Sequence, residues 1–356
     1  MATENFHILT TSTFSDRLLN WFDQHGRKDL PWQQQPTPYH VWLSEIMLQQ
    51  TQVSTVIPYY QRFTDRYADI ASLAKASIED VLALWTGLGY YARARNLHKA
   101  AVIMTNEHDA KMPNTIEQLI ALPGVGRSTA GAIMALAHHQ NYPILDGNVK
   151  RVLTRYDGIS GWPGKKVIEN QLWKRAEQLL PKHRIANYIQ AQMDLGATVC
   201  TRSKPKCNKC PLQSDCHAFL RDIPQNYPSP RSKKIIPTRQ INWLVAQLPT
   251  KEVLLQQRAN TGIWGGLWSF PELNSIENID HICMNQFNLE TTKIVTQTHF
   301  RHVLSHFKLD IHPHLVSCSI DSNYITENKN FSWYKIQDAL QLGLPAPVKT
   351  FLISLQ

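Results

Sequence analysis

The sequence has no long apolar run and little cysteine, and both absences narrow what it can encode. Only six of the 356 residues are cysteine, too few and too unevenly spread for the disulfide framework of a small secreted domain. No apolar stretch approaches the roughly 20 residues of a membrane helix. Residues 1–14 are polar and lack the basic and then apolar layout of a signal peptide. We therefore expect a cytoplasmic protein without a membrane segment.

Acidic residues are also scarce, with 28 Asp and Glu against 37 Lys and Arg and a net charge of +9. The imbalance is strongest between Cys200 and Arg239, where two acidic residues stand against Arg202, Lys204, Lys206, Lys209, Arg221, Arg231, Lys233, Lys234 and Arg239. Such a patch suits a phosphate backbone. Charge alone is weak support for this interpretation, because many basic proteins never touch nucleic acid.

Four of the six cysteines, Cys200, Cys207, Cys210 and Cys216, form a C-x6-C-x2-C-x5-C run. Four thiolates at this spacing are typical of a tetrahedral metal centre, either zinc or an iron–sulfur cluster. The spacing does not choose between the two.

The hydrophobic pattern changes along the chain, which is long enough for two domains. Before residue 225 the apolar spacing is helical, as in Val149, Val152, Leu153 and Tyr156. Residues 303–311 alternate as a strand does. The basic, proline-rich stretch between has no apolar period. We predict an all-helical domain over 1–225, a linker over 226–238 and a mixed sheet domain over 239–356.

A glycine turn, Leu-Pro-Gly-Val-Gly at 122–126, separates two helical patterns. Gly124 and Gly126 let backbone N–H groups approach an anion at the start of the next helix, where the dipole favours negative charge. A plain tight turn between packed helices is the alternative.

Two carboxylates are candidates for chemistry. Asp146 precedes a helical pattern as an N-cap would, and the helix dipole favours its ionised form. It could simply cap the helix, or oppose positive charge developing on a substrate. Glu45 has almost wholly apolar neighbours, so desolvation should raise its pKa toward that of a proton donor near neutral pH. The alternative for Glu45 is a place at the edge of an apolar helix stripe.

Residues 85–95 mix aromatics, glycines and arginines, a composition suited to stacking on bases and pairing with phosphates. With the motifs above, in this order, the chain resembles the helix-hairpin-helix DNA glycosylases, and among them the adenine DNA glycosylases. The resemblance runs from about residue 26 to 349, through Leu-Pro-Trp at 30–32, Ser-Glu-Ile-Met-Leu-Gln-Gln-Thr-Gln-Val at 44–53, Leu-Gly-Tyr-Tyr-Ala-Arg at 88–93, the turn at 122–126, Leu-Asp-Gly-Asn-Val at 145–149 and the four cysteines.

This resemblance implies a base excision repair enzyme. Such an enzyme flips adenine out of double-stranded DNA where it is mispaired with 8-oxoguanine or guanine, and cleaves its N-glycosidic bond to leave an abasic site. By the same resemblance Glu45 protonates the adenine ring, and Asp146 stabilises the oxocarbenium-like sugar electrostatically or by covalent attack. A [4Fe–4S] cluster, rather than zinc, is implied on the four cysteines.

The remaining site residues are implied in the same way. Gln50 and Tyr90 match positions that fill or wedge the base stack, with Leu48 on the same loop and Trp32 lining the adenine pocket. The matching DNA-binding motifs further include Gly124, Gly126, Ser128 and Asn148.

Position 128 bears on the type of reaction. In the related endonuclease III a lysine stands there and forms a Schiff base that leads to strand cleavage, whereas here the residue is Ser128. We therefore expect a monofunctional glycosylase, with a weak imine at Lys150 as the exception. The alternatives are a bifunctional glycosylase-lyase and a catalytically silent DNA-binding protein.

The C-terminal part resembles the MutT-like (Nudix) nucleotide pyrophosphatases at residues 264–271, but their paired glutamates are missing from 274–290. We expect an α+β recognition domain without hydrolase activity. Leu304, Ser305 and His306 stand where the family has a Phe-Ser-His loop that probes 8-oxoguanine. Ser305 and His306 keep its hydrogen-bonding capacity. We expect a monomer, nucleoid-associated if the source is bacterial.

Overall fold

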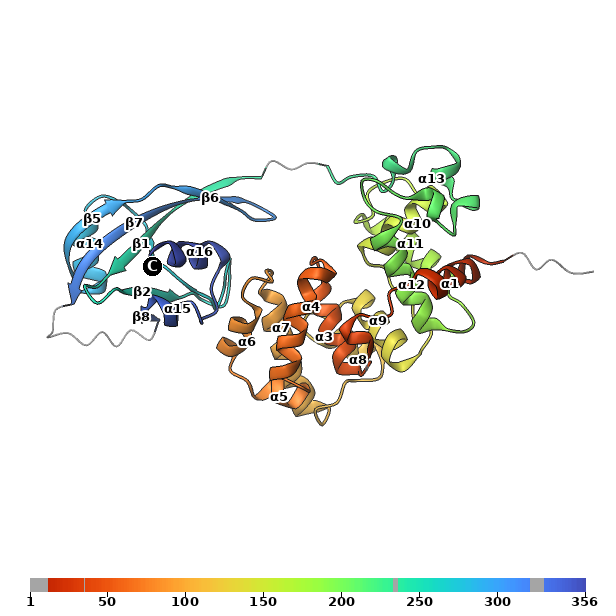
Figure 1. The fold of residues 1–356 in the computed structure, drawn as a ribbon, viewed down its shortest axis with the longest axis horizontal. Helices are drawn as coiled ribbons and strands as arrows, with labels where there is room; N and C mark the ends of the chain where they lie inside the picture. Colours follow the sequence, from red (N-terminus) through yellow and green to blue (C-terminus); the bar gives the residue numbers. More distant parts are fainter. Residues whose placement is uncertain (1–11, 35, 233–235, 321–329) are drawn as a thin grey trace, which may run out of the picture. The chain divides into compact units, whose positions relative to one another are not determined.

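The computed structural model describes residues 12–34, 36–232, 236–320 and 330–356. Most of residues 1–14, where no signal peptide is predicted, therefore lie outside the described residues. Lys233 and Lys234 of the basic patch also lie outside them. By their contacts the residues form two compact units (Figure 1). Unit 1 comprises residues 1–71 and 99–232, and unit 2 comprises 72–98 and 233–356.

The regular secondary structure of the described residues of unit 1 is entirely helical, as predicted. Its elements are α1 (Phe14–His25), α2 (Pro31–Gln34), α3 (Pro38–Leu48), α4 (Val53–Arg66), α8 (Ile116–Ala121), α9 (Arg127–His138), α10 (Gly147–Asp157), α11 (Lys166–Gln178), α12 (Ile185–Thr198), α13 (His217–Leu220) and three short 3₁₀ turns. Side-chain oxygens cap several of them, including Thr13 on α1, Thr37 on α3 and Asp146 on α10. Each accepts a backbone N–H of the first turn that would otherwise lack a partner.

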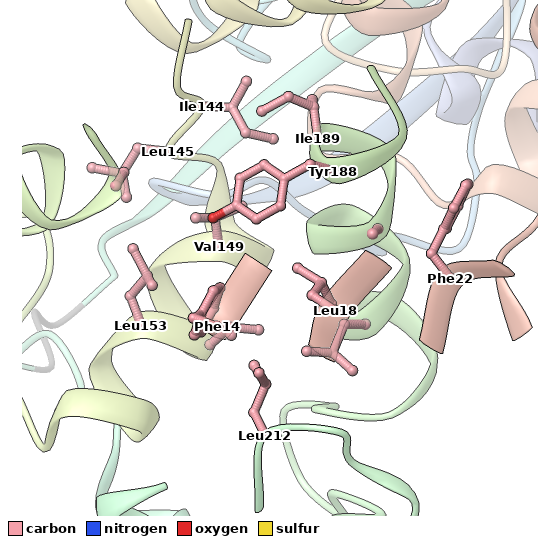
Figure 2. Packing of buried hydrophobic residues seen from close by; sticks show 14 of the residues in the cluster. Phe14, Leu18, Phe22, Ile144, Leu145, Val149, Leu153, Tyr188, Ile189 and Leu212 are labelled. Carbon is pink, nitrogen blue, oxygen red and sulfur yellow. The ribbon is translucent and has the colours of Figure 1, made fainter. Parts of the chain in front are cut away.

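The main core of unit 1 lies between α1, α10 and α12. Phe14 and Leu18 of α1 meet Val149 of α10 and Tyr188 of α12, with Leu212 closing the cluster from below (Figure 2). Ile144 and Leu145 belong to the same cluster, so the segment that leads into Asp146 is anchored in the core.

Unit 2 contains a mixed sheet. Its strands are β1 (Thr238–Gln247), β2 (Glu252–Gln257), β3 (Trp268–Ser269), β4 (Glu272–Leu273), β5 (Leu289–Thr296), β6 (Phe300–Val303), β7 (Lys308–Ile320) and β8 (Phe331–Lys335). The strand order is β3-β2-β1-β7-β5, with β4 on β1, β6 on β7 and β8 on β2. Among the strands of the described residues, only the β1–β7 pairing is parallel, in register from Thr238 opposite Lys308 to Gln247 opposite Ser317.

Helices α14 (Ile279–Phe287), α15 (Ile336–Ala339) and α16 (Ala346–Ser354) complete the C-terminal part. Helix α14 packs on β5 (Figure 1), and the α+β class is as predicted. The single strand predicted over 303–311 is wrong, because residues 304–307 form a turn between β6 and β7, closed by a 3.0 Å hydrogen bond from the Leu304 N–H to the Phe307 carbonyl. The alternation continued across the turn because both strands of a hairpin have period two.

Unit 2 also includes residues 72–98 from the helical part of the sequence. They hold the end of α5 (Ile70–Lys75), all of α6 (Ile78–Trp85) and the start of α7 (Ala92–Glu107). The first half of the predicted linker contacts unit 1: the Arg231 guanidinium lies 5.1 Å from the Trp162 ring centre, and the Gly161 N–H donates to Ser229 Oγ at 3.1 Å.

None of the helices among the described residues combines the length and the apolar character needed to span a bilayer.

Leu18→Ala should destabilise unit 1, because this side chain is fully buried in the main core. We expect a loss of about 3 kcal/mol in free energy of unfolding from lost burial and the cavity left behind. Leu220→Ala is the matched control, since Leu220 is 64% exposed, and it should change stability by less than about 0.5 kcal/mol. Urea unfolding followed by far-UV circular dichroism measures both. Equal effects would mean that this cluster does not stabilise the fold.

Candidate active site

A pocket of about 1090 Å³ opens in unit 1 between its helices. Residues from α2 and α3, from the start of α9 and α10, and from α12 line it. It brings together six of the predicted site residues, namely Trp32, Glu45, Leu48, Ser128, Asp146 and Asn148. The volume lies at the upper end of the range for small-molecule sites, which is ample for a nucleobase with its sugar.

Glu45 lies on α3 between buried apolar residues and turns its carboxyl into this pocket. No described residue forms a hydrogen bond or ion pair with that carboxyl. Burial raises its pKa to about 8, with the negative charge of Asp146 as the second cause. Glu45 is therefore mostly protonated at neutral pH, as its apolar neighbours predict.

Asp146 is the N-cap of α10. Its Oδ1 accepts the Val149 N–H at 2.7 Å, and its Oδ2 accepts from Asn148 Nδ2 at 3.3 Å. Burial raises the pKa of Asp146, while these hydrogen bonds and the charge of Arg151 oppose the rise. The sequence predicted that the helix dipole favours the ionised form of Asp146, but burial outweighs the favourable contacts and the pKa rises.

The two carboxylates nevertheless differ in protonation. The charge of Asp146 contributes to the raised pKa of Glu45, whereas Glu45 is not among the causes of the shift at Asp146. Asp146, with hydrogen-bond donors, ionises first, and its charge then helps to keep Glu45 neutral. Of the two, Glu45 is therefore the carboxyl that keeps its proton to the higher pH.

Arg151, which was not among the predicted site residues, ties this site to the cysteine segment. Its Nη2 donates to Asn148 Oδ1 at 2.8 Å and to the Gly196 carbonyl at 2.7 Å, and its Nε donates to the Cys200 carbonyl at 2.7 Å. Through Asn148 this guanidinium reaches the carboxylate of Asp146. The sequence feature that could have identified Arg151 is its position one turn into a helix that begins at a candidate catalytic residue.

Ser128 shapes the same site, because its Oγ accepts the Leu145 N–H at 3.0 Å and so fixes the residue before Asp146. Lys150 is held differently. Its Nζ forms an ion pair with Glu169 Oε1 at 2.7 Å, and Lys150 is not among the residues that line the pocket.

The glycine turn joins α8 to α9 as a helical hairpin. Gly124 has φ +80°, which favours glycine, and at Gly126 no atom lies within 4 Å of where a Cβ would stand. The turn therefore leaves open space at the start of α9. Neither glycine lines the pocket.

Gln50 and Tyr90 share an unusual backbone. Gln50 has φ +60° just after α3, and Tyr90 has φ +52° just before α7. Both side chains are exposed. Left-handed non-glycine residues are strained and persist where surrounding contacts hold them, often at functional sites. Gln50 does not line the pocket, and Tyr90 belongs to unit 2.

The four clustered cysteines are free thiols that line one small pocket of unit 1. Arg155 holds their segment: its Nη1 donates to the Thr201 carbonyl at 2.7 Å and lies 3.3 Å from Cys200 Sγ, and its Nη2 donates to the Arg202 carbonyl at 3.0 Å. Among the described residues, no three His, Cys, Asp or Glu side chains are arranged to hold a single metal ion.

Ser305 and His306 lie in unit 2, at the exposed turn between β6 and β7. Ser305 Oγ is 3.3 Å from His306 Nδ1, and the His306 ring packs edge-on against Phe307 with ring centres 4.5 Å apart. Both side chains present polar atoms to solvent.

Comparisons with known proteins agree with this geometry. Residues 43–178 match the HhH-GPD superfamily base excision DNA repair protein model, and 242–354 match the NUDIX domain. The adenine DNA glycosylase of Buchnera aphidicola subsp. Schizaphis graminum is 41% identical over 345 residues, covering 97% of this chain and 99% of that protein. The human adenine DNA glycosylase is 35% identical, covering 85% of this chain and 66% of its own length.

Among solved structures, a thermostable thymine-DNA glycosylase superimposes with a TM-score of 0.54 at 28% identity, covering 58% of this chain and 95% of its own. A non-covalent endonuclease III–DNA complex gives 0.51 at 21% identity over 58% of this chain and 94% of its own, a likeness of fold. With relatives above 40% identity along nearly its whole length, and with Glu45 and Asp146 lining one pocket, the chain belongs to the adenine DNA glycosylase family of base excision repair.

Proposed function

We propose that this adenine DNA glycosylase acts on double-stranded DNA in which adenine is mispaired with 8-oxoguanine or guanine, and that it leaves an abasic site. The observation that carries the proposal is the pair of carboxylates, Glu45 and Asp146, which line one pocket, with the pKa of Glu45 raised to about 8 and the charge of Asp146 contributing to that rise. Cleavage of an N-glycosidic bond needs an acid for the leaving base and an anion for the developing sugar cation.

Glu45 is the acid in this proposal. Its raised pKa keeps a proton available at neutral pH, and transfer of that proton to a ring nitrogen lets adenine leave as a neutral base. Asp146 then opposes the positive charge that develops on the sugar. The hydrogen bonds from Val149 and Asn148 fix the orientation of its carboxylate, which suits electrostatic stabilisation and leaves covalent attack as the alternative.

The walls of the pocket suit an extruded base. Trp32 is buried edge-on against Tyr60, with ring centres 5.4 Å apart, and it presents a flat apolar wall beside Leu48. Gln190 and Met193 of α12 line the pocket as well. The Gln190 Nε2 donates to Asp194 at 2.8 Å, so the amide oxygen stays free of that bond to receive a base N–H.

Contacts with the duplex come from other exposed parts. Gln50 and Tyr90 stand on strained turns, as residues that enter a base stack would, and the open space at Gly126 suits a phosphate. Ser305 and His306 supply polar atoms on an exposed turn for reading the base opposite adenine.

We assign a [4Fe–4S] cluster to Cys200, Cys207, Cys210 and Cys216. Their common pocket supports the assignment, as does the Arg155 guanidinium beside Cys200 Sγ, since hydrogen bonds to sulfur tune thiolate ligands. Once bound, the cluster would cross-link this segment, so that its basic residues, Arg202, Lys204, Lys206 and Lys209, face phosphates from a fixed loop.

The monofunctional reaction is supported by Ser128, which is bound to the backbone, and by Lys150, which is engaged with Glu169 outside the pocket lining. A glycosylase-lyase needs a free amine at the reacting sugar. We expect the enzyme to act as a monomer in the cytoplasm, associated with the nucleoid in a bacterium.

The mispair assignment can be tested in single-turnover reactions on duplexes with adenine opposite 8-oxoguanine, guanine or thymine. Cleavage should appear only after hot alkali, which breaks the strand at abasic sites, and only in the first two duplexes. Strand breaks without alkali would indicate lyase chemistry. Turnover opposite thymine would contradict the mispair specificity, and the absence of release from every duplex would favour a binding protein.

The rate of adenine release should follow the protonation of Glu45. It should hold up to about pH 8 and fall tenfold per pH unit above it, because only the protonated acid donates. Glu45→Gln keeps the shape of the residue without a transferable proton, and should lose more than about a hundredfold in rate while binding the duplex. A pH profile unchanged above pH 8 would place the acid elsewhere.

Stability provides an independent control for the same variant. Because the folded-state pKa of Glu45 is raised, its contribution to folding is fully present below the ordinary value of 4.5 and is lost as the pH rises to about 8. The Glu45→Gln variant has no carboxyl to deprotonate at this position, so it does not lose this stability as the pH rises. Its free energy of unfolding relative to the unsubstituted enzyme should therefore rise across that range.

Arg151→Met should slow adenine release about a hundredfold, because the Asn148 amide that orients Asp146 loses its anchor. Duplex affinity should change by only a few fold. Arg175→Met is the matched control, since Arg175 forms an ion pair with Asp157 in the same unit and lies outside the pocket lining. Single-turnover rates and binding titrations measure both. A normal rate in Arg151→Met would show that Asp146 is oriented without this network.

A further inference from the structure

The turn that presents Tyr90 is strained in three places. Gly87 has φ +100°, Gly89 has φ +75° and Tyr90 has φ +52°. The Tyr90 side chain is 47% exposed at the end of this turn. A non-glycine residue in the left-handed region costs about 1 kcal/mol or more, so neighbouring contacts must hold it there.

Part of that support comes from the segment itself. The Trp85 indole N–H donates to the Gly89 carbonyl at 3.1 Å, and Arg93 Nη2 donates to the same carbonyl at 2.9 Å and to the Leu88 carbonyl at 3.2 Å. The Arg93 guanidinium lies 5.3 Å from the Trp85 ring centre and 5.6 Å from that of Tyr90. These contacts hold the inside of the turn.

Further contacts that hold the Tyr90 turn come from the C-terminal part of unit 2. The Tyr91 hydroxyl donates to the Leu344 carbonyl at 2.8 Å and accepts the Gly87 N–H at 3.3 Å. The Leu344 N–H in turn donates to Thr86 Oγ1 at 3.3 Å. One backbone unit at Leu344 is therefore bound from both sides by the residues that flank the strained turn.

Arg95 makes a second attachment on the other side of Tyr90. Its Nη1 donates to the Gly265 carbonyl at 2.7 Å. Gly265 lies in a tight turn where an added Cβ would come within 2.7 Å of the Asn260 carbonyl oxygen. This acceptor is therefore held by its own backbone packing, and both attachments join the Tyr90 turn to rigid main chain of the C-terminal domain.

We infer that Tyr91 and Arg95 are positioning residues, through which the C-terminal domain fixes the turn that presents Tyr90 to the base stack. The inference rests on the proposed function, in which Tyr90 wedges the duplex while adenine is extruded. In addition to that function, the C-terminal domain, which we expect to recognise the base opposite adenine, also holds Tyr90 in place. Residues 72–98 accordingly cluster with residues 233–356 in one compact unit.

The test measures base extrusion separately from chemistry, using the full-length enzyme. A duplex with 2-aminopurine opposite 8-oxoguanine reports unstacking of the extruded base by a rise in fluorescence. Tyr91→Phe keeps the ring and removes the hydroxyl that donates to Leu344 and accepts from Gly87. The extruded population should fall at least about fivefold, the size expected for the loss of one neutral hydrogen bond. Tyr334→Phe is the matched control, because no described residue bonds its hydroxyl, and it should give the full signal.

A purely structural role would lower stability without this specific loss. The Tyr91→Phe variant should have a melting temperature within about two degrees of that of the control variant. It should also release adenine at the normal rate from a duplex in which the adenine lies opposite an abasic site, because no base pair has to be broken there. For Arg95, the Arg95→Met variant should lose extrusion and Arg95→Lys, which keeps a donor, should retain most of it.

The outcomes separate the two proposals. Full extrusion by Tyr91→Phe and Arg95→Met, in a preparation that releases adenine normally, would overturn the positioning role and leave the proposed function intact. An unsubstituted enzyme that extrudes the base and never releases adenine would overturn the proposed function instead. Extrusion lost equally in Tyr334→Phe would also contradict the inference, because the effect would not be specific to the turn.

Discussion

The site depends on one physical constraint, which is that two carboxylates line one pocket and are both desolvated by the protein around them. In water each carboxyl would have a pKa near its ordinary value, and burial raises both pKa values here. Among the described residues, Asp146 alone of the two accepts hydrogen bonds at its carboxylate, so Asp146 ionises at a lower pH than Glu45. The asymmetry of hydrogen bonding, rather than a difference in residue type, produces a donor and an anion from two similar groups.

That asymmetry is built by the fold. The core between α1, α10 and α12 anchors Ile144 and Leu145 before Asp146 and Val149 after it, so the start of α10 cannot shift away from the pocket. Arg151 adds polar ties to α12 and to the segment that begins at Cys200. These hydrogen bonds link the backbone of that segment to the residues around Asp146.

The sequence predicted what local patterns determine. The apolar neighbours of Glu45 indicated its raised pKa, and Asp146 was recognisable as an N-cap. The net pKa shift of Asp146 was not predictable, because it depends on how many atoms from distant segments surround the carboxyl. Arg151 was missed for the same reason, since its partners Gly196 and Cys200 are far away in the sequence. The strand over 303–311 failed because a hairpin turn can preserve a period of two.

The grouping of residues 72–98 with the C-terminal domain has a consequence for how the enzyme engages DNA. Gln50 stands on a strained turn of unit 1, and Tyr90 stands on one of unit 2. Contacts with Arg93, Tyr91 and Arg95 inside unit 2 hold the strained backbone at Tyr90. If both side chains enter the same base stack, the bound duplex must bridge the two units. Recognition of the opposite base by unit 2 would then bring its wedge to the stack, while unit 1 supplies the acid and the anion.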